Sequence, residues 1–168
     1  MSSRPMASTS GLNTDLFHQL RALVLFLLIC FAAAAVGSLF PPGDWYADLT
    51  RPSFSPPNWV FGPVWTVLYV AMAIAAWLVW REAGLRKGRI AFTLFGIQLL
   101  LNAAWSILFF GLHSPGAALI DLSLLWLAIA ATIFAFSRHS KTSALLLVPY
   151  LGWVTFAGCL NYGFWTLN

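Results

Sequence analysis

Five long apolar runs constrain the fold of this chain more than any other feature of its sequence. They cover about residues 16–40, 59–80, 90–110, 116–136 and 142–165. A bilayer core of about 30 Å needs roughly 20 apolar residues per helix, so each run is long enough to cross a membrane. The runs do not alternate as barrel strands do, and backbone groups in lipid must satisfy their own hydrogen bonds. We therefore predict an all-α integral membrane protein, a multi-pass five-transmembrane-helix bundle.

Composition supports this class and excludes others. Of the 168 residues, 60% are hydrophobic and only 8% are charged, whereas a soluble domain carries roughly a quarter charged residues. The basic residues lie between the apolar runs and form no patch, so nucleic acid is not an expected partner. Cys30 and Cys159 each lie inside an apolar run, which favours free thiols over a disulfide.

The segments between the runs suggest how the chain is organised. Residues 1–15 are polar and predict a disordered N-terminal tail, and residues 16–168 form the membrane domain. Residues 41–57 are rich in proline and carry the aromatic residues Trp45, Tyr46 and Phe54. A long loop of this kind commonly has a function, so we predict that it is a lid. Residues 81–89 read as a basic linker.

The basic residues also predict an orientation. With five spans, the two termini lie on opposite sides of the membrane. The N-terminal side then receives Arg4, Arg21, Arg81, Arg86, Lys87, Arg89, Arg138 and Lys141, and the other side receives only Arg51. Short loops rich in Lys and Arg stay in the cytoplasm. We therefore expect a bacterial cell membrane, with the N-terminus cytoplasmic and the C-terminus outside.

This orientation places the unusual residues in one half of the bilayer, next to the predicted lid. They are Trp59, Trp65, Asn102, Trp105, Asp121, Trp153, Asn161 and Tyr162. Helical spacing puts Asn102 with Trp105, and Trp153 with Asn161, on shared faces. Aromatic walls with a few amides and one carboxylate suit a flat, largely apolar ligand with polar groups.

Other interpretations of these residues stay open at this point. An interfacial anchor explains Trp45 better than a ligand contact does. The indoles of Trp65, Trp105 and Trp153 also suit core packing. Asn102 and Asn161 also suit hydrogen bonds between helices. Asp121 is a functional candidate as the only acid inside a span, although it lies close enough to the helix start to reach the interface.

Common catalytic and metal-binding patterns are not seen. His18, His113 and His139 lie at helix ends or in loops, and no phosphate-binding glycine loop or hydrolase motif occurs. We therefore assign no catalytic residue, no metal ligand and no obligatory cofactor.

Three segments resemble the translocator protein / tryptophan-rich sensory protein (TspO/MBR) family. Residues 44–69 (DWYADLTRPSFSPPNWVFGPVWTVLY) are similar to its WYxxLxKPxWxPPxWxxxPxWxxLY signature. Residues 98–111 (QLLLNAAWSILFFG) and 148–161 (VPYLGWVTFAGCLN) resemble its QLxLNxxWxxxFFG and VPYLxWxxxxxxLN segments. There are departures: Phe54 stands where many members carry Trp, and no basic residue follows Tyr162 as the animal cholesterol motif requires.

The resemblance implies a five-helix bundle, often a homodimer, that binds porphyrins such as protoporphyrin IX or haem. It implies pocket residues at Trp59, Phe61, Gly62, Trp65, Trp105, Trp153, Ala157, Leu160 and Asn161. To these we add Trp45, Phe54, Asn102 and Asp121 from the residue pattern. The expected function is a porphyrin receptor with a sensory or regulatory role. The alternatives are a transporter of porphyrins or sterols and an enzyme that degrades porphyrin photo-oxidatively.

Overall fold

The computed structural model describes residues 9–168, whose regular elements are all helical and are joined by loops and turns. The predicted tail lies partly outside the described residues, and its later part, from Thr9, is already helical. In chain order, the elements are α1 (Thr9–Ser38), α2 (Asp44–Asp48), the 3₁₀ turn η1 (Asn58–Val60), α3 (Phe61–Lys87), α4 (Arg89–Ser106), the π-helical turn η2 (Ile107–Gly111), α5 (Pro115–Ser137) and α6 (Lys141–Leu167).

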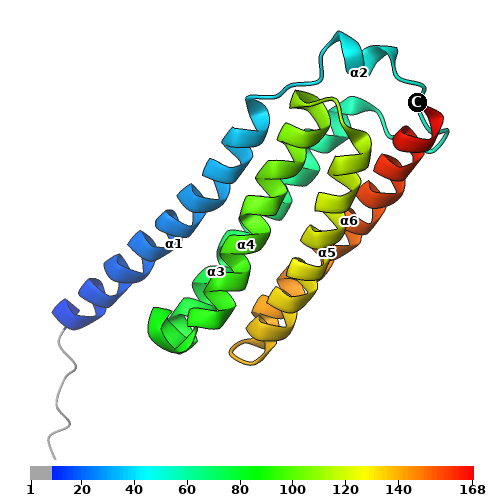
Figure 1. The fold of residues 1–168 in the computed structure, drawn as a ribbon. Coiled ribbons are helices and arrows are strands. Elements are labelled where there is room, and N and C mark those ends of the chain that lie inside the picture. The colour runs from blue at the N-terminus through cyan, green and yellow to red at the C-terminus, as the bar shows by residue number, and fades with distance from the viewer. Residues whose placement is uncertain (1–8) are drawn as a thin grey trace, which may run out of the picture.

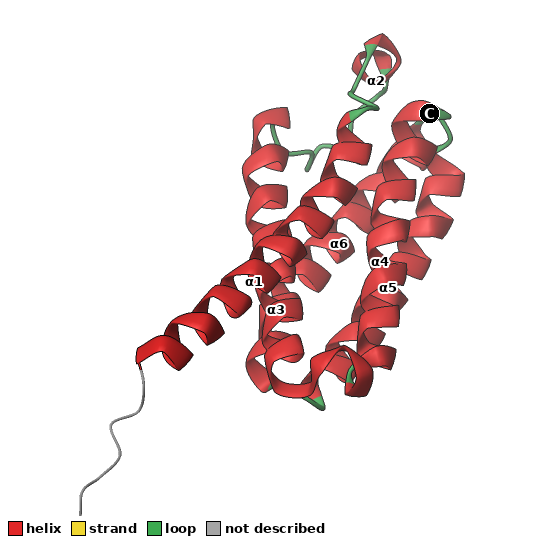
Figure 2. Ribbon diagram, turned by 90° about the vertical axis from the view of Figure 1, so that its left-hand side faces the viewer, coloured by secondary structure: helices red, strands yellow, loops and turns green. Residues whose placement is uncertain are grey.

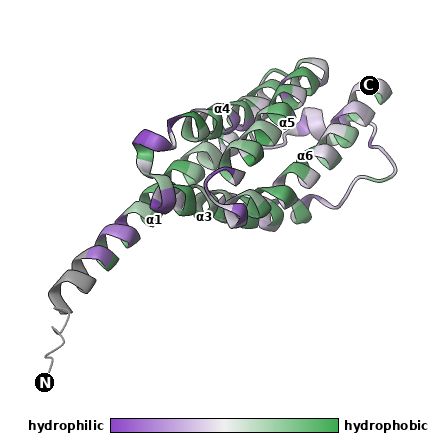
Figure 3. Cartoon of the chain, turned by 90° about the horizontal axis from the view of Figure 1, so that it is seen from below, coloured by the Kyte–Doolittle hydropathy of each residue, from purple (hydrophilic) through white to green (hydrophobic). Residues whose placement is uncertain are grey.

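Five of these helices are long and apolar enough to cross a membrane, which confirms the predicted fold class. They run side by side as one bundle, with the short helix α2 and the C-terminus at the same end (Figure 1). Seen from the side, the first half of α1 leans away from the other helices (Figure 2). Hydrophobic residues line all five long helices, and hydrophilic residues gather at connecting turns and along the first part of α1 (Figure 3).

The helices pack in a fixed set of neighbours. Helix α5 packs against α4 and α6, while α1 packs against α3 and α4, and α3 also packs against α6. Small residues allow these close approaches: Ala73, Ala75 and Ala76 of α3 are fully buried. A Cβ atom at Gly37 of α1 would lie 3.0 Å from Ser106 Oγ of α4. Gly37 therefore serves a contact within the chain, and the homodimer stays a prediction.

The segment predicted as a basic linker is mostly helical. Helix α3 continues to Lys87, beyond the predicted end at residue 80, and is interrupted at Gly84, whose φ is +65°. The apolar pattern ends at the membrane boundary, but arginine, glutamate, alanine and lysine are good helix formers in water. The linker therefore reduces to Gly88 between α3 and α4.

The predicted lid, residues 41–57, is ordered by contacts with the bundle. The Asn168 side chain accepts a hydrogen bond from Thr50 N (2.9 Å) and donates to Thr50 O (3.1 Å). Arg51 Nη1 donates to Asn58 Oδ1 at 3.0 Å. Pro52 is buried, and a Cβ atom at Gly163 of α6 would lie only 2.6 Å from Pro52 Cγ. The loop is therefore attached to the end of α6 at two places.

We expect Gly163→Ala to loosen the lid, because the new methyl group overlaps the Pro52 ring. Hydrogen exchange of the backbone amides in residues 44–57 should become faster, while exchange in the long helices stays unchanged. Gly96→Ala is the matched control, since nothing lies within 4 Å of a Cβ atom there. Equal exchange in both variants would show that the Gly163–Pro52 contact does not hold the loop.

Candidate functional site

A cavity of about 520 Å³ lies in the bundle at the lid end. All five long helices and the start of the lid contribute to its wall. The lining residues that carry the argument are Phe31, Gly37, Pro41, Tyr46, Asn58, Phe61, Gly62, Trp65, Tyr69, Asn102, Trp105, Phe109, Leu122, Trp153, Ala157, Leu160, Asn161 and Phe164. The volume falls in the range of about 300–1,000 Å³ that is usual for small-molecule sites.

Most of the predicted site residues meet in this cavity. They come from three helices that are far apart in the sequence: Phe61, Gly62 and Trp65 from α3, Asn102 and Trp105 from α4, and Trp153, Ala157, Leu160 and Asn161 from α6. The shared faces predicted from helical spacing are therefore turned towards one another.

Trp45, Phe54 and Trp59 do not line the cavity. Trp45 stacks on His113, with ring centroids 4.4 Å apart, so it joins the lid to the α4–α5 connection. Phe54 packs edge-on against Phe156 outside the cavity. Trp59 is 74% exposed, because the η1 turn directs it outwards. The structure therefore places Trp45, Phe54 and Trp59 outside the cavity wall, contrary to their prediction as site residues.

Asp121 also lies outside the cavity wall. It precedes the cavity-lining Leu122 on α5, so its side chain points about 100° away around the helix. The residue is 7% exposed, and its Oδ2 atom has no hydrogen-bond partner among the described residues. The Asp121 side chain is therefore buried among the helices, beside the cavity wall but not part of it.

Asn102 joins three helices through hydrogen bonds. Its Oδ1 atom accepts a hydrogen bond from the Tyr69 hydroxyl of α3. Its Nδ2 atom donates to the Tyr150 hydroxyl of α6 at 3.0 Å. All three side chains are buried. In lipid an unpaired polar group is costly, so this network fixes the relative positions of α3, α4 and α6 beside the cavity.

Asn161 makes a second polar connection. It accepts a hydrogen bond from Trp105 Nε1 at 2.9 Å and donates to the Pro115 carbonyl at 2.7 Å. The Trp105 ring is thereby held in one orientation between α4 and α6. Both asparagines thus line the cavity and also connect helices. The position in the cavity wall and the hydrogen bonds between helices, which the sequence left as alternatives, therefore occur in the same residues.

Aromatic faces dominate the rest of the wall. Trp105 stacks on Phe109 with centroids 5.2 Å apart, and Trp65 packs on Tyr69 at 5.6 Å. Phe61 packs edge-on against Trp153 at 5.8 Å. Ring faces and edges at these separations favour further aromatic partners. The cavity is therefore suited to a flat, apolar, conjugated molecule.

Tyr46 forms part of the cavity wall on the lid side. Its ring packs against Phe109, Phe110 and Phe164, and the Arg51 guanidinium lies 4.9 Å from the ring centroid. Burial raises the pKa of the Tyr46 phenol, and the positive charge of Arg51 opposes that rise. Tyr46 is therefore a neutral hydrogen-bond donor at neutral pH, close to the positive charge of Arg51.

Sequence reasoning missed the contribution of α1. Phe31, Ala34 and Gly37 line the cavity, but residues 22–37 of α1 are apolar on every side and their pattern does not show which face is inward. The residues Tyr46, Phe109 and Phe164 were not assigned to the site either. All three are aromatic and lie in the lid or at the lid end of a helix, and this position could have indicated that they line the cavity.

The comparisons with known proteins agree with the motifs. The model of the TspO/MBR family matches residues 26–166, which is most of the chain. The chain belongs to the TspO/MBR family. A tryptophan-rich protein TspO from Chlorobaculum tepidum is 45% identical over 157 residues, covering 89% of this chain and 98% of that protein.

Relatives of the TspO/MBR chain come from distant organisms. The human translocator protein is 46% identical over 138 residues, covering 79% of this chain and 82% of that protein. The tryptophan-rich sensory protein of Cereibacter sphaeroides is 39% identical over 143 residues, covering 85% of this chain and 89% of that protein. The family assignment made from the three motifs is therefore confirmed.

We expect Asn102→Leu to destabilise this TspO/MBR chain, because it leaves the buried Tyr69 and Tyr150 hydroxyls without a partner. Each unsatisfied buried group costs about 1–3 kcal/mol. Thermal unfolding in detergent, followed by circular dichroism, should show a lower midpoint. The triple variant with Tyr69→Phe and Tyr150→Phe should recover part of the loss, since no buried hydroxyl then remains unpaired. A midpoint equal to that of the unsubstituted protein would contradict the proposed importance of this network.

Proposed function

We propose that this protein is a membrane receptor that binds a porphyrin in the cavity at the lid end and has a sensory or regulatory role. The observation that carries the proposal is the aromatic cavity, in which Trp65, Trp105 and Trp153 from three helices converge. A porphyrin is flat, conjugated and largely apolar, so it matches ring faces better than a flexible lipid chain does.

The polar groups near the cavity suit the carboxylates of a porphyrin. Arg51 is the only basic residue of the lid segment 41–57, and it bonds Asn58, which lines the cavity. Arginine pairs well with carboxylates. We therefore expect the macrocycle between the indoles and its acidic groups towards Arg51.

Binding fits the lining better than chemical turnover does. Among the described residues, no histidine, carboxylate, lysine or arginine side chain lines the cavity. These side chains are the commonest general acids and bases, and of the other candidates only the tyrosine hydroxyls of Tyr46 and Tyr69 line the cavity. We therefore favour a receptor over a porphyrin-degrading enzyme.

Protoporphyrin IX titration of the protein in liposomes tests the proposal. Trp65→Leu and Trp153→Leu should each raise the dissociation constant about two- to tenfold, because an aromatic contact contributes about 0.5–1.5 kcal/mol. The Soret absorbance is the appropriate signal, since it does not depend on the number of tryptophans. Trp153 Nε1 makes no hydrogen bond with the described residues, so Trp153→Leu breaks ring contacts and no hydrogen bond.

Trp126→Leu is the matched control, because Trp126 lies on α5 outside the cavity and bonds Thr155. Its affinity for protoporphyrin IX should equal that of the unsubstituted protein. If the two cavity variants also keep that affinity, the porphyrin does not bind in this cavity and the proposal fails.

We also propose that the lid faces the outside of a bacterial cell and that the α3–α4 turn faces the cytoplasm, as the basic residues predict. A variant without Cys30 and Cys159 can carry a single new cysteine at either end. A membrane-impermeant maleimide applied to intact cells should label Ser53→Cys and leave Lys87→Cys unlabelled. Both positions are exposed in the structure. The reverse labelling pattern would invert the orientation.

A further inference from the structure

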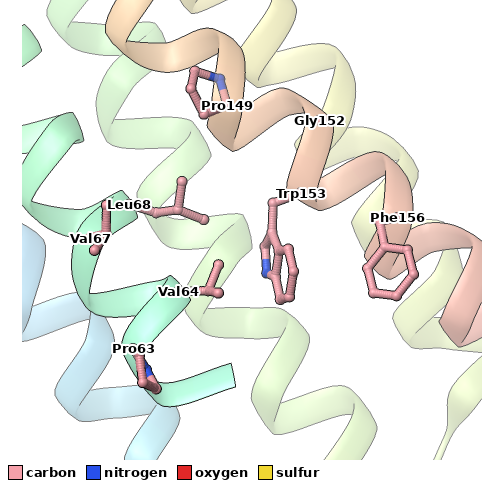
Figure 4. A pocket seen from close by; sticks show the side chains of 8 residues that line it. All are labelled: Pro63, Val64, Val67, Leu68, Pro149, Gly152, Trp153 and Phe156. Atoms are coloured by element: carbon pink, nitrogen blue, oxygen red, sulfur yellow. The ribbon is translucent and has the colours of Figure 1, made fainter. Parts of the chain in front are cut away.

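A second hollow lies on the outer side of the bundle, between α3 and α6. Its volume is about 480 Å³. Helix α3 contributes Val64, Val67 and Leu68 to it, and α6 contributes Pro149, Gly152 and Phe156 (Figure 4). Val67 is 67% exposed on a membrane-spanning helix, so the hollow opens towards lipid. We call it the α3–α6 groove.

Trp153 separates the groove from the cavity. It is the only described residue that lines both hollows. Its indole extends from α6 towards Val64 of α3 (Figure 4). It packs against Phe61 of the cavity at 5.8 Å and against Phe156 of the groove at 5.5 Å. One side chain therefore forms the partition between the two spaces.

The Trp153 indole lacks the hydrogen bond that restrains Trp77, Trp105 and Trp126. Its Nε1 atom is buried and has no hydrogen-bond partner among the described residues. In contrast, Trp105 Nε1 donates to Asn161 and Trp77 Nε1 donates to the Gln19 carbonyl. Rotation of Trp153 about its side-chain bonds therefore breaks ring contacts but no hydrogen bond. An unpaired N–H at the partition is also available to a passing acceptor.

The backbone beside Trp153 gives the ring room to move. Pro149 lies inside α6 and has no N–H, so the preceding turn lacks one helical hydrogen bond. A Cβ atom at Gly152 would find nothing within 4 Å. The groove side of α6 is thus open next to the indole.

The lid offers a more restrained path. Passage there requires the Thr50–Asn168 and Arg51–Asn58 hydrogen bonds to break and the buried Pro52 to leave Gly163. A flat apolar molecule dissolved in the bilayer reaches the groove without leaving lipid. The walls of the groove are apolar apart from the Trp153 N–H.

We propose that the ligand of the cavity enters and leaves sideways from the bilayer, through the α3–α6 groove, and that Trp153 is the gate. This inference rests on the proposed function, because it takes the porphyrin-type ligand as the molecule that passes. The groove is a path and not the place where the ligand rests. Obstructing it changes the rates of exchange and leaves the bound state unaltered.

Stopped-flow mixing of protoporphyrin IX with the protein in liposomes tests the gate. Gly152→Leu fills the groove from α6, and Val67→Phe fills it from α3. Both variants should lower the association and dissociation rate constants by about tenfold, within the one to three decades over which association rates vary among related complexes. The dissociation constant should not change. Gly96→Leu is the control, because Gly96 faces open space on α4, away from both hollows.

The outcomes separate this inference from the proposed function. If the unsubstituted protein binds no porphyrin, the proposed function is wrong, and so is the proposed gate. Binding with unaltered rate constants in both groove variants would contradict the gate alone. A higher dissociation constant in both variants would also contradict it. If Asn168→Ala, which releases Thr50, raises the rates while the groove variants do not lower them, the ligand passes through the lid.

Discussion

Lipid supplies no hydrogen-bond partners, so the constraint on which this structure depends is that backbone and key side-chain polar groups pair with one another inside the protein. It produces the five long helices, and it also decides how they associate. Asn102 joins α3, α4 and α6 through two tyrosine hydroxyls, and Asn161 joins Trp105 to the start of α5. These bonds border the cavity, so the hollow is part of a fixed framework.

The same bonds determine what the cavity presents to a ligand. Because the two asparagines are occupied by other helices, mainly ring faces and edges remain free. The polar groups that could contact a ligand then lie at the lid end, where Arg51 is close to Tyr46 and Asn58. A conjugated macrocycle with acidic substituents on one edge combines both requirements.

The two boundaries of the cavity differ in how they are held. The lid is attached by hydrogen bonds and by the close approach of Pro52 to Gly163. The partition towards α3 and α6 is one indole that makes only ring contacts, beside an internal proline and an open glycine. Under the proposed function, this asymmetry lets an apolar ligand exchange through the groove while the lid stays attached.

The sequence by itself determined the five helices, their order and the family, because apolar length and long motifs are local properties of the chain. It also indicated the inward faces of α3, α4 and α6, where aromatic residues and amides recur at helical spacing. Only the tertiary structure decided that Trp45, Phe54 and Trp59 lie outside the cavity and that the uniformly apolar second half of α1 lines it. Rotation about a helix axis and the direction of a loop side chain depend on packing partners from distant segments, which no local pattern specifies.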